Sequence, residues 1–256
     1  MRHPWEHDFP DAVVHCAWQP PPSQRNSKSP KGGPFLKLHP QYRQAKHDRD
    51  MQSAINIIEE VAKEQALIDL RAIAIRHGVT PRLIAPAATV DESKNALAIG
   101  YAQWLGRQMD WPVEERVFRE KSQSKDREGA WFRMAHPSTF YGKIDTSAPY
   151  IIVDDVITLG GTLVDLRSFI INKGGKAIAM SAIASHDGRH SQIKLSDVTR
   201  HSLEKRYGPD LSGFCLDVLG HSHDCLTHEE AQKLLGCAGY VELRANTQRE
   251  RDKTIT

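Results

Sequence analysis

An apolar run that ends in two carboxylates is followed by a glycine turn in the stretch "YIIVDDVITLGGTLVD" (residues 150–165). We expect a buried strand with Asp154 and Asp155 at its carboxyl end, where parallel sheets bind their ligands. The turn leads into a helix, whose first N–H groups have no partner within the helix and attract anions. Glycines let the backbone approach such an anion closely. The predicted monophosphate site consists of Thr158, Leu159, Gly160, Gly161 and Thr162.

The two carboxylates require a different chemical group, because a phosphate held by the turn would repel them. Ribose hydroxyls can donate hydrogen bonds to carboxylates, and Mg²⁺ prefers oxygen ligands that it shares with substrate phosphates. The stretch therefore predicts a sugar phosphate, with its 5′-phosphate on the turn and its 2′ and 3′ hydroxyls on Asp154 and Asp155. The alternative is an ordinary buried strand followed by a glycine-rich turn. Neither the P-loop pattern nor the dinucleotide pattern G-x-G-x-x-G is present here.

Strands that alternate with helices are expected to position this site. Such alternation predicts an α/β fold, in which a parallel sheet is flanked by helices that connect its strands. Ser93 is the candidate N-cap of the helix that precedes the second strand. The expected elements are a helix within 48–75 that is broken once before His77, a strand over 81–86, a helix over 93–109, strands over 111–120 and 149–155, a turn and helix over 158–175 and a strand over 176–184.

Three parts of the chain are distinguished by their composition. Residues 1–45 contain the run "QPPPSQRNSKSPKGGP" and are expected to be an irregular leader. Residues 46–185 form the predicted α/β core with its leading helix, and residues 186–256 a mostly helical C-terminal appendage. Within the core, residues 120–148 are polar and too long for an ordinary connection, which is typical of a cover over an active site or of disorder.

The overall composition narrows the class of protein. The 256 residues carry a formal charge of +2, which does not favour a nucleic-acid partner. No apolar run approaches the roughly 20 residues needed to span a bilayer, and the N-terminus lacks the apolar segment of a signal peptide. The four cysteines have no C-x-x-C spacing, so a disulfide framework is not expected. A cytoplasmic protein is the simplest prediction.

The stretch "YIIVDDVITLGGTL" resembles the phosphoribosyl-pyrophosphate (PRPP) signature of type I phosphoribosyltransferases. The order of elements over residues 82–184 is similar to that family as well. The whole chain resembles a phage- and plasmid-associated group described as phosphoribosyltransferase-like, through its "WQP", "HPSTFYGKI" and "GHSHDCLTHEEAQKLL" segments. The resemblance implies a type I phosphoribosyltransferase-like fold with N-terminal and C-terminal appendages. It also implies PRPP as substrate, Mg²⁺ bound through PRPP and through Asp154 and Asp155, and a homodimer by analogy.

Further site residues follow from this resemblance. Asp154 and Asp155 match the acids that contact the ribose, and the second acid would stabilise positive charge on the sugar in the transition state. The segment 87–95 takes the place of the pyrophosphate loop, although the glycine common in that loop is missing. The segment 120–148, with Trp131, Arg133 and His136, matches the loop that closes over the reaction centre. The candidate pyrophosphate-binding residues are Ala87, Ala88, Glu92, Lys94, Asn95, Arg119 and Lys121.

The function that these residues predict is transfer of ribose 5-phosphate from PRPP to a nitrogenous base or related acceptor, with release of pyrophosphate. A module that binds PRPP or a nucleotide without turnover is one alternative, and a nucleotide or nucleoside hydrolase is another. The identity of the acceptor does not follow from the sequence.

A histidine-rich cluster in the C-terminal part has two interpretations. His221, His223, Cys225 and His228 are all metal-ligand types, but their spacing matches no standard zinc motif. The segment Thr227 to Glu230 has the spacing of a capping box at the start of a helix. A structural role is therefore the preferred interpretation, and a metal site the alternative.

Overall fold

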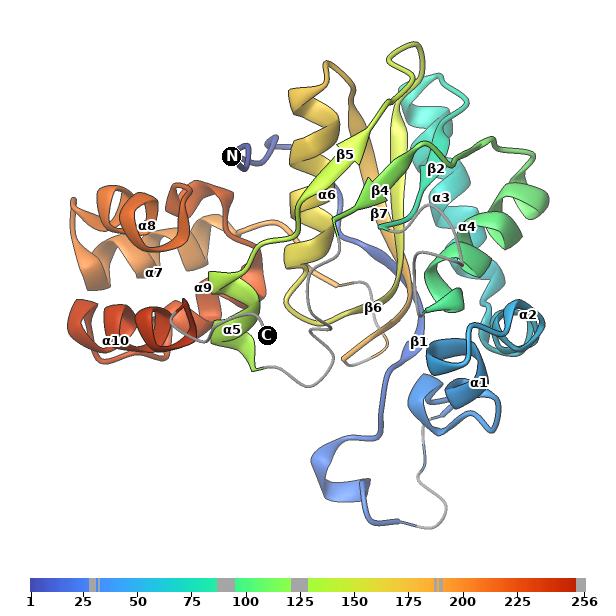
Figure 1. Cartoon of the computed structure of the whole chain (residues 1–256), viewed down its shortest axis with the longest axis horizontal. Coiled ribbons are helices and arrows are strands. Elements are labelled where there is room, and N and C mark those ends of the chain that lie inside the picture. The colour runs from blue at the N-terminus through green and yellow to red at the C-terminus, as the bar shows by residue number, and fades with distance from the viewer. Residues whose placement is uncertain are drawn as a thin grey trace.

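The computed structural model describes residues 1–27, 31, 33–86, 95–120, 129–186, 188 and 191–251. Its centre is a five-stranded parallel sheet with the order β1-β7-β6-β2-β3 (Figure 1). The predicted fold class, a parallel α/β sheet flanked by helices, is confirmed. The strands are β1 (Val13–Ala17), β2 (Arg82–Ile84), β3 (Val113–Glu114), β6 (Tyr150–Ile157) and β7 (Ala177–Ser185).

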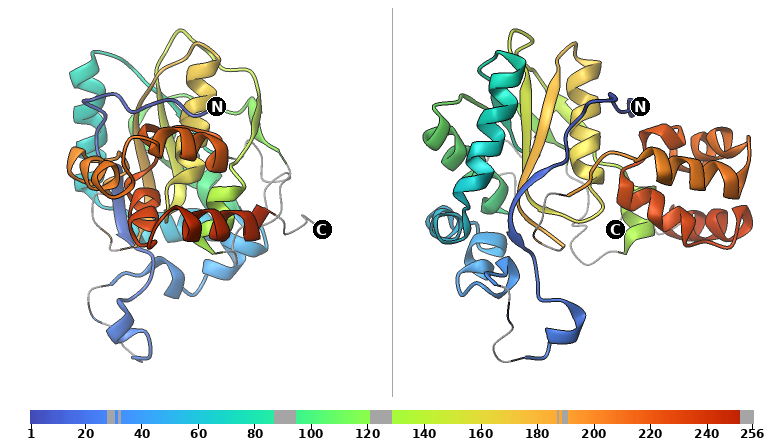
Figure 2. Two further views of the ribbon diagram at one scale, coloured as in Figure 1. Left: turned by 90° about the vertical axis from the view of Figure 1, so that its left-hand side faces the viewer. Right: turned by 180° about the vertical axis from the view of Figure 1, so that it is seen from behind.

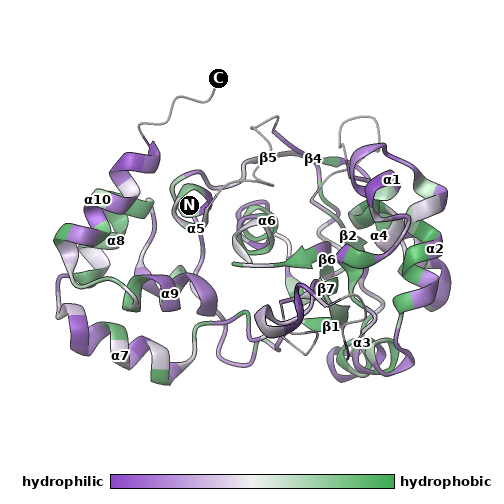
Figure 3. Cartoon of the chain, turned by 90° about the horizontal axis from the view of Figure 1, so that it is seen from below, coloured by the Kyte–Doolittle hydropathy of each residue, from purple (hydrophilic) through white to green (hydrophobic). Residues whose placement is uncertain are grey.

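Helices cover both faces of the sheet, as Figures 2 and 3 show. Successive side chains of a strand point to opposite faces, and β6 follows this rule. Ile151 and Val153 join the core beneath α2, α3 and α4, whereas Ile152 joins the core beneath α6. The helix bounds are α2 (Met51–Val61), α3 (Glu64–His77), α4 (Ala96–Met109) and α6 (Gly161–Asn172).

The expectation of an irregular leader over residues 1–45 is wrong for much of this stretch. β1 pairs in parallel with β7 and is buried on both faces, so it lacks the polar alternation that marks a half-buried strand. Before β1, Arg2, Trp5 and Phe9 are buried as well. After β1 come η1 (Pro22–Gln24), η2 (Leu36–Leu38) and α1 (Tyr42–His47). The division of the chain into three domains stays a prediction.

The break expected in the helix within 48–75 lies between α2 and α3. Two other boundaries differ from the sequence-based expectation. The N-cap of α4 is Asn95, whose side chain accepts a hydrogen bond from the N–H of Leu97, while Ser93 lies outside the described residues. The strand expected over 111–120 is divided between β3 of the central sheet and β4 (Val117–Arg119) of a separate one.

The segment 120–148 contains regular structure in its described part. β4 pairs antiparallel with β5 (Phe140–Gly142), and α5 (Ala130–Ala135) lies between them in sequence. α5 packs against the C-terminal helices, which gather beside it in Figure 1. These helices and one 3-10 turn are α7 (Asp197–Tyr207), α8 (Leu211–Leu219), η3 (His223–Cys225), α9 (His228–Leu235) and α10 (Tyr240–Arg251).

No helix in the described part of the chain is long and apolar enough to cross a membrane.

Candidate functional site

The acid pair lies at the point where the order of strands reverses. From β2 the chain moves outward to β3, and from β6 it moves the opposite way to β7, so the carboxyl ends of β2 and β6 mark a switch point. β2 ends at Ile84, opposite Ile152, while β6 continues to Ile157 alongside β7. Asp154 and Asp155 therefore lie within β6, not at its end as predicted. Because β2 ends at Ile84, opposite Ile152, the two acids lie just beyond the end of β2 and beside the switch point.

Asp155 is buried among polar partners from two other elements. Its Oδ2 accepts a hydrogen bond from Nζ of Lys46 at 2.6 Å and from Nδ2 of Asn95 at 2.9 Å. Its Oδ1 accepts the N–H of Val156. Lys46 comes from α1 and Asn95 caps α4, so two helices on the same face of the sheet converge on one carboxylate oxygen.

The two acids differ in charge because of these partners. Burial raises the pKa of Asp154 to about 8, and the neighbouring carboxylate of Asp155 adds to the rise. Burial acts in the same direction on Asp155, but the ammonium of Lys46 and the amide of Asn95 outweigh it and lower the pKa of Asp155. Of the two acids, Asp155 beside Lys46 is therefore the one that ionises more readily.

The glycine turn has the backbone geometry that an anion site requires. Gly160 is the N-cap of α6 with a φ of 78°, a left-handed conformation that favours glycine. Within the described residues, the N–H groups of Gly161 and Thr162 donate no hydrogen bond to the protein. On the side of the turn formed by α5, Nη1 of Arg133 donates to Oγ1 of Thr158 at 2.8 Å. The turn thus offers partnerless N–H donors, with a guanidinium beside them.

The C-terminal helices pack directly against this turn. Oγ1 of Thr227 donates to the carbonyl oxygen of Leu159 at 2.5 Å. A Cβ added at Gly160 would lie 2.2 Å from Cδ1 of Ile193. The predicted capping box of α9, between Thr227 and Glu230, is confirmed. The turn is therefore shaped by α6 on one side and by the C-terminal part on the other.

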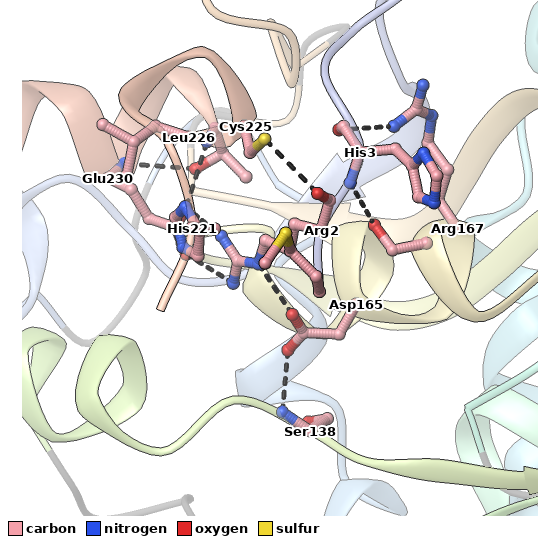
Figure 4. A network of polar contacts seen from close by, with 12 residues as sticks. Arg2, His3, Ser138, Asp165, Arg167, His221, Cys225, Leu226 and Glu230 are labelled. Atoms are coloured by element: carbon pink, nitrogen blue, oxygen red, sulfur yellow. Dashed lines mark hydrogen bonds and ion pairs between the residues drawn. The ribbon is translucent and has the colours of Figure 1, made fainter. Parts of the chain in front are cut away.

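A buried ionic network joins the N-terminal segment, α6 and α9 (Figure 4). Nε of Arg2 donates to Asp165 at 2.7 Å, and Nη1 of Arg2 donates to Glu230 at 2.6 Å. Asp165 also accepts the N–H of Ser138 at 2.7 Å. Burial works against the charged form of Glu230, but Arg2 outweighs it and lowers the pKa of this carboxyl. This network reaches the glycine turn, because a Cβ added at Gly161 would lie 3.0 Å from Oε1 of Glu230 and 3.3 Å from Nη2 of Arg2, and it does not include the acid pair.

The predicted pyrophosphate-binding residues do not form one group in the described structure. Asn95 lies at the acid pair, where it binds Asp155. Arg119 is exposed at the end of β4 and makes no ion pair with a described residue. Ala87, Ala88, Glu92, Lys94 and Lys121 lie outside the described residues.

Two residues of the site were not in the predicted set. Lys46 had no sequence signal, because it lies over 100 positions from Asp155 on a short helix. Arg133 was named only as a member of the covering loop, and its contact with Thr158 depends on how α5 packs on the C-terminal helices.

The donor set around Asp155 does not fit a directly bound Mg²⁺. Both carboxylate oxygens of Asp155 already accept hydrogen bonds, and an ammonium lies where a cation would have to approach Oδ2.

In the histidine cluster, Nδ1 of His221 lies 3.0 Å from the carbonyl oxygen of Ser222. Sγ of Cys225 donates to the carbonyl oxygen of Arg2. Among the described residues, no group of three or more His, Cys, Asp or Glu side chains is arranged to hold a metal ion.

Two curated proteins are similar to this chain in sequence. Protein TraN of Escherichia coli is 26% identical over 220 residues, which cover 86% of this chain and 48% of TraN. An uncharacterized protein of Haemophilus influenzae is 24% identical over 173 residues, 68% of this chain and 35% of that protein. The chain thus spans about half or less of the length of these relatives. No protein-family model matches it.

Two solved structures show a partial similarity to this chain. Adenine phosphoribosyltransferase from Leishmania tarentolae has a TM-score of 0.31 and 15% identity, covering 51% of this chain and 62% of that enzyme. The same enzyme from Leishmania donovani has a TM-score of 0.33 and 15% identity, covering 71% of this chain and 75% of that enzyme. Similarity at this level carries no argument about the reaction.

Proposed function

We propose that the chain is a phosphoribosyltransferase, which transfers ribose 5-phosphate from PRPP to a nitrogenous acceptor and releases pyrophosphate. The observation that carries the proposal is the location of Asp154 and Asp155, at the switch point of a parallel sheet and on the strand that leads into the Gly160 turn. Both parts of the motif therefore face the edge where such sheets bind ligands. The acceptor is left open.

In this proposal the turn holds the 5′-phosphate. The N–H groups of Gly161 and Thr162 and the positive end of the α6 dipole supply donors and charge. Arg133 adds a guanidinium beside Thr158, and guanidinium groups bind phosphate oxygens well. The turn would thereby anchor the sugar, and the anchored sugar would present its hydroxyls to β6.

The acid pair then stabilises the reacting sugar. Cleavage at C1 develops positive charge on the ribose, and a fixed carboxylate nearby favours that state over the ground state. Asp155 is the ionised member, because Lys46 and Asn95 lower its pKa. The pyrophosphate leaves with its bonding electron pair, and the nitrogen of the acceptor forms the new bond to C1. Mg²⁺ would enter with PRPP, bound to its oxygens, and neutralise the charge of the leaving pyrophosphate.

The proposal is tested by measuring the pyrophosphate that the purified protein releases from PRPP. The assay is run with Mg²⁺ and with a panel of purine, pyrimidine and pyridine bases and of nucleosides. We expect release that depends on one class of acceptor. PRPP that stays intact with every acceptor tested would falsify the proposal, and calorimetry would then show whether the protein still binds PRPP.

One observation favours a second candidate, a PRPP-binding module without turnover. The ammonium of Lys46 lies 2.6 Å from Oδ2 of Asp155 and offsets part of the negative charge that the transition state needs. Binding of PRPP in the absence of pyrophosphate release would support this candidate over the enzyme. Release of free ribose 5-phosphate without an acceptor would instead indicate a hydrolase.

A further inference from the structure

Lys46 belongs to the candidate sugar site although it lies outside the motif. Its side chain is 13% exposed and that of Asp155 is 7% exposed, so the pair is largely withdrawn from solvent. α1, which carries Lys46, packs against α2 and α4, and α4 begins at Asn95. The same packing that positions Asn95 therefore positions the ammonium.

The chemistry around Oδ2 of Asp155 suits a hydroxyl group better than a metal ion. The oxygen accepts from Nζ of Lys46 at 2.6 Å and from Nδ2 of Asn95 at 2.9 Å. A hydroxyl is both a donor and an acceptor, so it is satisfied where a carboxylate and an ammonium lie side by side. A divalent cation needs oxygen ligands and would be repelled by the ammonium at this distance.

We propose that Lys46 and Asp155 together bind the ribose hydroxyls. In this arrangement the ammonium of Lys46 is the cation beside Asp155, in place of a bound metal ion. A hydroxyl donates to Oδ1 of Asp155, which accepts the N–H of Val156 and has a second lone pair, and Lys46 donates to the oxygen of a hydroxyl. This inference rests on the proposed function, because it assumes that the acid pair faces the sugar. It deepens that function by making Lys46 a substrate-binding residue that selects ribose.

Two consequences distinguish this arrangement from a metal-bridged site. A sugar that lacks the 2-hydroxyl makes one hydrogen bond fewer to Lys46 and Asp155. Because a hydrogen bond to a charged group corresponds to about 10- to 100-fold in affinity, this sugar should bind more weakly by that factor. Binding of a sugar that carries no pyrophosphate should also be independent of Mg²⁺, since the protein itself supplies the cation.

The experiment is calorimetry with ribose 5-phosphate and with 2-deoxyribose 5-phosphate, each with Mg²⁺ and with EDTA. The wild-type protein should bind the ribose compound at least about tenfold more tightly, and equally with or without the metal. Lys46→Met should reduce the preference to less than about threefold, and Lys46→Arg should retain most of it. Lys205→Met changes an exposed lysine of α7 and should match the wild type. Melting curves show whether each variant is folded.

Several results would overturn the inference while sparing the proposed function. These are equal binding of both sugars by the wild type, binding that requires Mg²⁺, or an unchanged preference in Lys46→Met. If Lys46→Met does not fold, the inference is tested on the wild type and Lys46→Arg alone. The measurements are the affinities of these two proteins for the two sugars, each with Mg²⁺ and with EDTA. Failure of PRPP and of both sugar phosphates to bind the wild type overturns the proposed function and this inference together.

Discussion

The hydroxyl of Thr227 donates a hydrogen bond to the carbonyl oxygen of Leu159, one residue before the glycines of the phosphate turn. The same hydroxyl accepts the N–H of Glu230 and so caps α9. A single buried atom therefore connects the start of a C-terminal helix with the turn that we expect to bind phosphate.

Replacing Thr227 by Val should weaken both connections. Loss of an N-cap costs about 1 kcal/mol, and loss of the bond to Leu159 about another 1 kcal/mol. Thr227→Val should therefore lower the free energy of unfolding by about 2 kcal/mol in urea denaturation and weaken PRPP binding. Thr227→Ser keeps the hydroxyl, and both quantities should stay near the wild type. Wild-type stability in Thr227→Val would show that these hydrogen bonds add nothing, and a loss in Thr227→Ser as large as that in Thr227→Val would show that the methyl group matters as well.

Gly160→Ala should disturb the turn through two separable effects. A left-handed φ costs a non-glycine residue about 1–2 kcal/mol, and the new Cβ would also lie 2.2 Å from Cδ1 of Ile193. Gly220 has nearly the same φ, 79°, but no heavy atom within 4 Å of an added Cβ. Gly220→Ala should thus show the backbone cost alone. We expect Gly160→Ala to lose about 1–3 kcal/mol more and to bind PRPP less tightly. Equal melting temperatures for the two variants would contradict this account.

Asp155→Asn tests the assigned charge. The amide can still accept from Lys46, so the fold should be kept, but the negative charge that stabilises the developing positive charge is lost. Pyrophosphate release should fall by about 10²- to 10³-fold, with PRPP affinity within about tenfold. Asp217→Asn, in an exposed pair with Arg244, should release pyrophosphate as the wild type does. Unchanged release by Asp155→Asn would remove Asp155 from the catalytic role.

Arg2→Met should be strongly destabilising, because it leaves the buried carboxylates of Asp165 and Glu230 without their common cation. Removing one partner of a buried ion pair costs about 3–5 kcal/mol. Arg244→Met breaks a pair whose side chains are 58% and 61% exposed, and such pairs contribute about 0–1 kcal/mol. Urea denaturation of the two variants measures the difference. Similar losses would mean that the network adds nothing beyond a surface pair.

His15 predicts how stability depends on pH. Burial, with a smaller effect of Lys63, lowers the pKa of His15 from 6.5 to about 4 in the folded protein. Between these two values the unfolded chain binds a proton that the folded chain does not, so stability falls as the pH is lowered. The contribution of His15 is complete above about pH 6.5, and about 3 kcal/mol of it is lost by about pH 4.

The measurement is urea denaturation at several pH values between 4 and 7. His15→Asn should flatten the dependence in this window, whereas His201→Asn, at an exposed position of α7, should leave it unchanged. If His15→Asn shows the same dependence of stability on pH as the wild type, that dependence comes from groups other than His15.

The parts of the site that could be predicted from sequence are those that are local. Asp154 to Thr162 carry strand, acids and turn within one short stretch, and the capping box at Thr227 is equally local. Lys46 was missed because its proximity to Asp155 depends on how α1 packs against α4. β1 was missed for a related reason. It is buried on both faces, and its partner strand β7 lies more than 160 residues further along the chain.

The order of strands also has a consequence for folding during synthesis. β1 lies at the edge of the sheet, where its partner is β7, and Arg2 binds Asp165 and Glu230. Residues 2–17 are translated long before these partners leave the ribosome, so the N-terminal segment must wait, unpaired, while the rest of the sheet is made. Pulse-labelling of ribosome-bound chains of increasing length should show Cys16 reactive toward thiol reagents until β7 has emerged, and protected afterwards.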